Sequence, residues 1–122
     1  MKNLIDSTLD MFIKAALSKK AIDLTILDVR GVASFADTFI ICSGRSNRQV
    51  SAIAEFIESY LKDRGIKPLG IEGLREGHWV LMDYGDVIIH VFHEPVREFY
   101  DLEGLWADAK RIDVDEKDYA IF

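Results

Sequence analysis

The stretch that decides the fold runs from residue 38 to residue 49 and reads TFIICSGRSNRQ. Its first five residues are continuously apolar rather than alternating, which is typical of a central β-strand covered on both faces by helices. Gly44 then breaks the strand. Ser46 and Gln49 have the spacing of a helix capping box, in which each side chain satisfies the other residue's free backbone N–H group. The stretch therefore predicts a buried strand followed directly by a helix.

The helix after Gln49 is predicted to end at Gly65, with Pro68 just beyond it. Apolar residues recur on one face of this helix at Val50, Ile53, Ala54, Ile57 and Leu61. A right-handed crossover is the most economical connection, and it makes a short strand at 69–71 parallel to the strand at 39–41. The next two strands, 78–82 and 87–93, read as a hairpin in which Gly85 takes the positive φ of a tight turn. The sheet is therefore predicted to be mixed.

Two helices and one more strand complete the prediction. Residues 5–17 have the apolar spacing of an amphipathic helix, which Asp6 or Ser7 can cap, and residues 24–29 read as a strand. Pro95 suits the first turn of a further helix, with Val96, Phe99 and Tyr100 expected to pack on one side. We expect one α/β domain over 1–112, with a mixed sheet of about five strands flanked by helices, and an acidic C-terminal tail over 113–122 that frays, although Ile112 and Val114 can pack at one edge.

The composition fits this prediction. The chain has 122 residues, of which 49% are hydrophobic and 30% charged, which is typical of a globular domain with one core. The single cysteine, Cys42, lies in an apolar run and is expected to be a core residue rather than a reactive thiol. No segment has the apolar length of a membrane span, and a cytoplasmic location is expected.

The net charge of −6 argues against broad binding to nucleic acid and favours a basic partner. Acidic residues gather between Glu94 and Asp108, where Arg97 is the one basic residue before Asp108. A solvated face is the plainer explanation of this cluster.

Catalytic and metal sites are not predicted. The Gly44–Ser46 turn can hold an anion at the start of a helix, but a nucleotidyltransferase would also need a pair of acidic residues alternating on a neighbouring strand, and the predicted strands do not provide it. His90 and His93 are three residues apart on a strand and point to opposite faces, and His78 has no ligand partner nearby in the sequence. Satisfied or exposed histidines are expected, without a cofactor.

Trp79 opens the hairpin and shares one face of its strand with Leu81 and Asp83, while Val80 and Met82 share the other. Both faces of this strand are apolar, so each must pack against other apolar groups. One cover is the protein's own helices, and the second is either another packed layer or an interface, where tryptophan and tyrosine are enriched. Spacing alone leaves a core role and an anchor role for Trp79 and Tyr84 open.

Three stretches resemble the ribosomal silencing factor family, also called Iojap-like. They are LDV at 27–29 through DTFIICSG at 37–44, then GHWVLMDYGDVIIHVF at 77–92, and REFYDLEGLW at 97–106. The resemblance covers about residues 5–112. Thr38 departs from it, because many members carry an aromatic residue there.

The resemblance implies a factor with a nucleotidyltransferase-like fold that lacks the catalytic carboxylates. It implies that the chain binds the large ribosomal subunit through ribosomal protein fourteen, sterically blocks the joining of the subunits and so represses translation. The contact residues that it implies are Trp79, Leu81, Asp83 and Tyr84, with Glu98 and Tyr100 at the rim.

Other readings stay open at this point. They are an assembly factor for the large subunit, a divergent nucleotidyltransferase-fold enzyme, and a homodimer of the free protein that hides the docking face. Contact with ribosomal RNA through residues such as Arg45 and Arg48 is expected to be peripheral at most.

Overall fold

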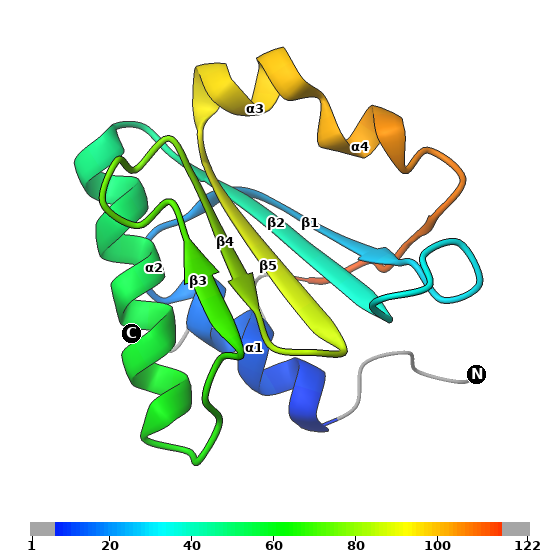
Figure 1. The fold of residues 1–122 in the computed structure, drawn as a ribbon, viewed down its shortest axis with the longest axis horizontal. Coiled ribbons are helices and arrows are strands. Elements are labelled where there is room, and N and C mark those ends of the chain that lie inside the picture. The colour runs from blue at the N-terminus through cyan, green and yellow to red at the C-terminus, as the bar shows by residue number, and fades with distance from the viewer. Residues whose placement is uncertain (1–6, 116–122) are drawn as a thin grey trace.

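The computed structural model describes residues 7–115 as four helices and six strands (Figure 1). The helices are α1 (Ser7–Leu17), α2 (Asn47–Lys62), α3 (Glu94–Tyr100) and α4 (Leu102–Leu105). The strands are β1 (Ile22–Asp28), β2 (Thr38–Gly44), β3 (Gly70–Glu72), β4 (Trp79–Asp83), β5 (Val87–His93) and β6 (Lys110–Arg111). The predicted cap residue Asp6 lies outside the described residues, as do residues 116–122 of the expected tail.

The strands form one mixed sheet in the order β3-β4-β5-β2-β1-β6. The expected number of about five strands is corrected to six, because β6 pairs with β1 through only two residues, too few for a sequence pattern to reveal. β2 and β5 pair in parallel over seven residues at the centre of the sheet. β3 runs in the same direction as β2, as predicted, but two strands separate them.

One face of the sheet is covered by α1 and α2. Every residue of β2 is buried, in agreement with the continuously apolar pattern. The predicted stripe of α2 is confirmed, because its buried residues are Val50, Ile53, Ala54, Ile57 and Leu61. Cys42 is fully buried in this core, and burial raises the pKa of its thiol to about 12, so it is an inert core residue.

The other face has a thinner cover, made by α3, α4 and the segment at 29–37. Figure 1 shows α3 and α4 away from α1 and α2. The core on this face contains Phe39, Ile41 and Phe92 from the sheet and Leu102 from α4. None of the α3 residues is fully buried, and the expectation that Phe99 packs inward is wrong, since its side chain is 80% exposed. This face therefore leaves aromatic side chains at the surface.

The local signals around α2 hold with two adjustments. The Ser46 hydroxyl accepts a hydrogen bond from the Gln49 backbone N–H at 3.0 Å, as a capping residue should. The Gln49 side chain, however, accepts from the backbone N–H of Arg45 at 2.6 Å rather than from that of Ser46. The helix ends at Lys62, and Gly65 follows in the turn with φ +81°.

The hairpin and the end of the described chain follow the predictions closely. Gly85 adopts φ +88° in the turn between β4 and β5. The backbone N–H of Ile112 donates to the carbonyl of Ile26 at 2.9 Å, and Ile112 and Val114 pack against the core of the α1–α2 face. Among the helices in the described range, none is long and apolar enough to cross a membrane.

Candidate partner-binding surface

Trp79 lies at the start of β4 on the thinly covered face and is half-buried. Its indole stacks on the ring of Phe92, with 4.8 Å between ring centroids, and the ring of Tyr100 lies 5.1 Å away on the outer side. The indole N–H donates to Nδ1 of His90 at 3.1 Å. Stacking below and a hydrogen bond at the edge fix the ring orientation, so Trp79 combines a core contact with an exposed edge.

His90 is the residue that holds the indole in place, and the sequence did not indicate it. The side chain is 4% exposed, and burial lowers the pKa of its imidazole to about 4. Because Nδ1 accepts a hydrogen bond from Trp79, the neutral ring carries its proton on Nε2, and no described residue accepts from that nitrogen. The expectation of a satisfied or exposed histidine is thus only half right for His90. A histidine at an inward position of a strand was the available signal.

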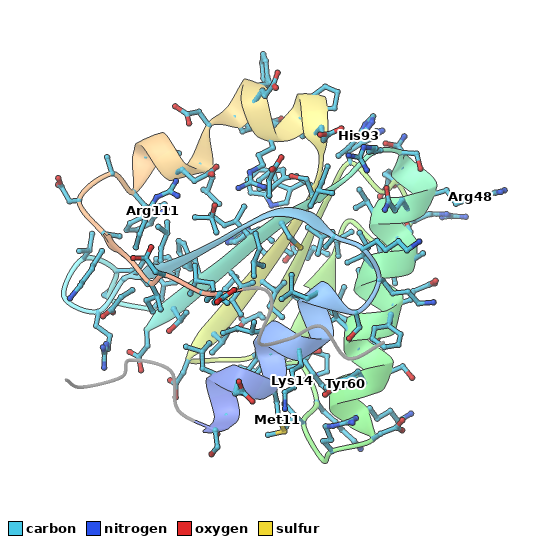
Figure 2. All side chains as sticks on the ribbon, turned by 180° about the vertical axis from the view of Figure 1, so that it is seen from behind. Met11, Lys14, Arg48, Tyr60, His93 and Arg111 are labelled. Atoms are coloured by element: carbon cyan, nitrogen blue, oxygen red, sulfur yellow. The ribbon has the colours of Figure 1, made fainter. Side chains whose placement is uncertain are left out.

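A groove of about 700 Å³ opens beside Trp79, between α3 and the segment that connects β3 to β4. We call it the Trp79 groove. Its lining residues are Asn47, Gly73, Glu76, His78, Trp79, His93, Pro95, Val96, Phe99 and Tyr100. Phe99 is 80% exposed and Tyr100 is 51% exposed, so two aromatic rings stand at its edge with little cover. Figure 2 shows His93 at this end of the molecule, close to Arg48 at the start of α2.

The six residues expected to contact a partner do not all come together. Trp79, Leu81 and Tyr100 lie on the thinly covered face, and Glu98 is exposed on α3. Asp83 lies at the far end of β4, where its carboxylate accepts from the backbone N–H of Gly85 at 2.8 Å and so stabilises the turn.

Tyr84 lies on the opposite face of the sheet. Its ring packs edge-on against Phe12 of α1, at 5.1 Å between centroids, within the core that α1 and α2 cover. Burial and, to a smaller extent, the Glu58 carboxylate raise the pKa of its phenol to about 12. The structure therefore groups Tyr84 with the core rather than with Trp79.

Arg97 is a further residue that the sequence analysis did not single out as structural. Its guanidinium donates to the Ser43 hydroxyl at 2.8 Å, to the Thr25 hydroxyl at 3.1 Å and to the backbone carbonyl of Asp23 at 2.8 Å. It also pairs with the Glu103 carboxylate at 2.8 Å, and this hydrogen bond lowers the pKa of Glu103. Arg97 thus ties α3 and α4 to β1 and β2.

The acidic run at 94–108 is therefore only partly a solvated face. Glu103 is paired with Arg97, and Asp101 caps α4 by accepting from the backbone N–H of Gly104, while Glu98 and Asp108 are exposed. In the sequence, the sign that some of these carboxylates form internal contacts was the single arginine, Arg97, among them.

The arrangement offers no catalytic constellation within residues 7–115. No group of three or more His, Cys, Asp or Glu side chains there lies close enough to hold a metal ion. The Asp28 carboxylate is paired with Arg30 at 2.8 Å, and hydrogen bonding to Arg30 lowers its pKa. The Gly44–Ser46 turn is closely packed, because a Cβ on Gly44 would meet the side chain and backbone of Val50 at 3.1 and 3.2 Å.

Comparison with known proteins identifies a family. Residues 2–120 match the family described as "Ribosomal silencing factor during starvation". Ribosomal silencing factor RsfS of Bacillus subtilis is 44% identical over 109 residues, which cover 89% of this chain and 92% of that protein. Mitochondrial assembly of ribosomal large subunit protein 1 of mouse is 31% identical over 101 residues, which cover 80% of this chain and 44% of that protein.

A solved structure shows the same architecture. The crystal structure of protein CV0518 from Chromobacterium violaceum superposes with a TM-score of 0.78 at 40% identity, covering 80% of this chain and 82% of that one. The sequence match over nearly the whole length and the shared fold lead to one conclusion: the chain belongs to the ribosomal silencing factor family.

Proposed function

We propose that this protein represses translation by binding the large ribosomal subunit through ribosomal protein fourteen and sterically blocking its union with the small subunit. The observation that carries the proposal is the Trp79 groove, where an oriented, half-buried indole is flanked by the exposed rings of Phe99 and Tyr100. Aromatic side chains of this kind are typical anchors at the centres of protein interfaces. Steric exclusion needs no catalytic residue or cofactor, and the action is expected in the cytoplasm.

The acidic character of the chain supports a basic partner. Glu98 and Asp108 are exposed on the α3–α4 side, and the chain as a whole carries a net charge of −6. Ribosomal proteins are basic, so complementary fields would speed the encounter while the apolar anchors hold the complex. Trp79, Leu81 and Tyr100 are the proposed contacts and Glu98 a rim position. Asp83 and Tyr84 are proposed to act through the turn and the core.

The experiment is co-sedimentation of the purified chain with isolated large subunits, followed by addition of small subunits to score joining. We expect selective pelleting with large subunits and reduced joining. Phe99→Ala removes an exposed ring without disturbing the core and should weaken binding at least about fivefold, whereas Trp79→Ala, which removes the anchor, should cost about 2 kcal/mol or more of binding free energy.

Leu69→Ala is the matched control, because Leu69 is 78% exposed but lies just before β3, outside the groove. Circular dichroism of each variant would confirm that it remains folded. A folded Trp79→Ala protein that binds as tightly as the wild type would refute the assignment of the anchor.

A role in assembly of the large subunit is the second candidate. It is favoured by the name of the mouse relative, which refers to assembly of the mitochondrial large subunit. Both roles would use the same surface. Binding to large subunits without any effect on joining, together with accumulation of immature particles in cells that lack the protein, would favour assembly over silencing.

The exposed rings of Phe99 and Tyr100 are also suited to self-association of the free protein. A second copy seated on this face would hide the docking surface until the ribosome competes for it. Sedimentation velocity over a wide range of protein concentrations, with Phe99→Ala as the comparison, would reveal such a dimer as a concentration-dependent mass that the variant loses.

A further inference from the structure

Positive charge gathers at one end of this acidic protein, where α2 begins. The side chains of Lys19, Lys20, Arg45, Arg48 and Arg75 are all exposed there. None of them takes part in an ion pair with another described residue. We call these five residues the basic end. Five exposed cations around the first turns of α2 contrast with the chain's net charge of −6 and suit a partner of opposite sign.

Contacts with α2 bring the first four of these residues together. The Gln49 side chain accepts from the backbone N–H of Arg45 at 2.6 Å and donates to the carbonyl of Lys20 at 3.5 Å. The ammonium group of Lys19 lies 5.4 Å from the centre of the Phe56 ring, which holds this side chain against α2. The segment after α1 and the turn before α2 therefore meet at the first turns of the helix.

Arg75 reaches the same place from the other side of α2. The Ser51 hydroxyl donates to the carbonyl of Leu74 at 2.8 Å. Gly77 packs so closely on the first turn of α2 that a Cβ there would meet the carbonyl oxygen of Asn47. The segment between β3 and β4 is thus fixed against α2, and Figure 2 shows Arg48 projecting from the same end of that helix.

The basic end adjoins the Trp79 groove. Asn47, in the first turn of α2, lines the groove together with His78 and His93. Glu98 is exposed on α3, and the exposed Glu76, next to Arg75, also lines the groove. The surface around the aromatic anchors therefore carries exposed cations as well as carboxylates.

We propose that the basic end contacts the phosphate backbone of ribosomal RNA beside the protein that the Trp79 groove binds. This inference rests on the proposed function and adds a second class of contact to it. Exposed, unpaired guanidinium and ammonium groups fit phosphate oxygens, and they carry no requirement for a base sequence. A large subunit presents basic protein and RNA phosphates side by side, and this surface offers aromatic anchors for the first and exposed cations for the second.

The balance of charge limits what the contact does. With a net charge of −6, the whole chain is repelled by RNA at long range, so five cations hold it on RNA alone only weakly. Once the aromatic anchors are docked, the same cations act at high effective concentration and add affinity and orientation. The RNA contact therefore supports the protein contact.

The test compares two double variants that lose the same charge. Arg45→Gln with Arg48→Gln removes two cations of the basic end, and Lys62→Gln with Lys67→Gln removes two exposed cations at and just after the other end of α2. We expect the first pair to bind large subunits about fivefold to tenfold more weakly than the second. The slope of log affinity against log salt should fall by about 1.5 for the first pair, from two lost phosphate contacts. Binding of both pairs to isolated ribosomal protein fourteen should stay equal.

The outcomes separate this inference from the proposed function. Equal binding of the two pairs to large subunits, or a matching loss on the isolated ribosomal protein, would overturn the RNA contact while leaving docking intact. If even the wild type fails to bind large subunits, the proposed function fails, and a labelled RNA hairpin at low ionic strength decides the inference by itself. Weaker hairpin binding by the first pair alone supports it, and equal binding overturns it. Loss of binding to anionic phospholipid vesicles without loss on RNA would overturn it in favour of a membrane.

Discussion

The burial of His90 beside Trp79 predicts how the stability of this protein depends on pH. His90 is buried on the thinly covered face, and burial lowers the pKa of its imidazole from 6.5 to about 4. Between these two values the unfolded chain binds a proton at this residue and the folded chain does not. The free energy of unfolding therefore falls as the pH is lowered from about 7 to 4, and the contribution of His90 is fully present only above pH 6.5.

The magnitude follows from the two pKa values. Relative to pH 8, protonation of the unfolded state at His90 should cost about 1 kcal/mol of stability at pH 6, about 2 kcal/mol at pH 5 and about 3 kcal/mol at pH 4. The carboxyls of Asp28 and Glu103, whose pKa values are lowered by Arg30 and Arg97, lose their own stabilisation at the acidic end of this range. Their effect is common to the wild type and to a His90 variant, so it cancels in the difference.

The assay is urea unfolding followed by circular dichroism at several pH values between 8 and 4, for the wild type and for His90→Gln. Glutamine keeps an acceptor for the Trp79 N–H but does not titrate. The variant will differ from the wild type at pH 8 because its packing differs, but the gap should shift in the variant's favour by about 2 kcal/mol between pH 8 and pH 5.

A direct measurement would check the cause. In an NMR titration the imidazole of His90 should keep its neutral chemical shifts from pH 8 down to pH 5. The imidazole signal that is missing from the spectrum of His90→Gln is the one that belongs to His90. An imidazole that titrates near pH 6.5 would refute the reasoning, as would parallel stability curves for the two proteins. Either result would mean that water reaches His90 and that the indole of Trp79 is less firmly oriented than the structure indicates.

Two further predictions concern the elements that carry the surface. Arg97→Met should lower the free energy of unfolding by about 2–3 kcal/mol, because Glu103 and the hydroxyls of Thr25 and Ser43 lose their shared partner. Adding Glu103→Gln should restore part of this stability in the same urea assay. A loss below about 0.5 kcal/mol would show that the network does not stabilise the fold. Gly77→Ala should lower the free energy of unfolding by about 2 kcal/mol or more, and Gly65→Ala should lower it by about 1 kcal/mol. Both glycines have φ above +70°, but only Gly77 packs closely against α2. Equal losses of stability in the two variants would rule out the close packing.

Much of the fold could be read from local patterns. The apolar run at 38–42 predicted a strand buried on both faces, and the spacing of Val50, Ile53 and Ile57 predicted the face of α2 that meets it. These predictions are robust because burial of a strand or helix face imposes a period on the residues themselves. β6 was missed, since two paired residues impose no period at all.

The candidate site divides in the same way. Residue types and alternation placed Trp79 and Leu81 on one face of a strand and left the cover of that face undecided. The separation of Tyr84 from Trp79 and the outward position of Phe99 depend on how α1 and α3 pack, which no local pattern contains. Arg97 and His90 act through partners that are distant in sequence, and neither residue type announces such a role by its spacing.

The sequence by itself determined the α/β class, the faces of its main elements, the acidic character and the family resemblance, because periodicity, charge and motif are properties of the chain in order. Only the tertiary structure decided which aromatic rings reach the surface, which histidine fixes the indole and which cations meet at the start of α2. Those features depend on contacts between residues far apart in the chain, such as Arg97 with Thr25 and Ser51 with Leu74, and such contacts exist only once the sheet and its helices are packed together.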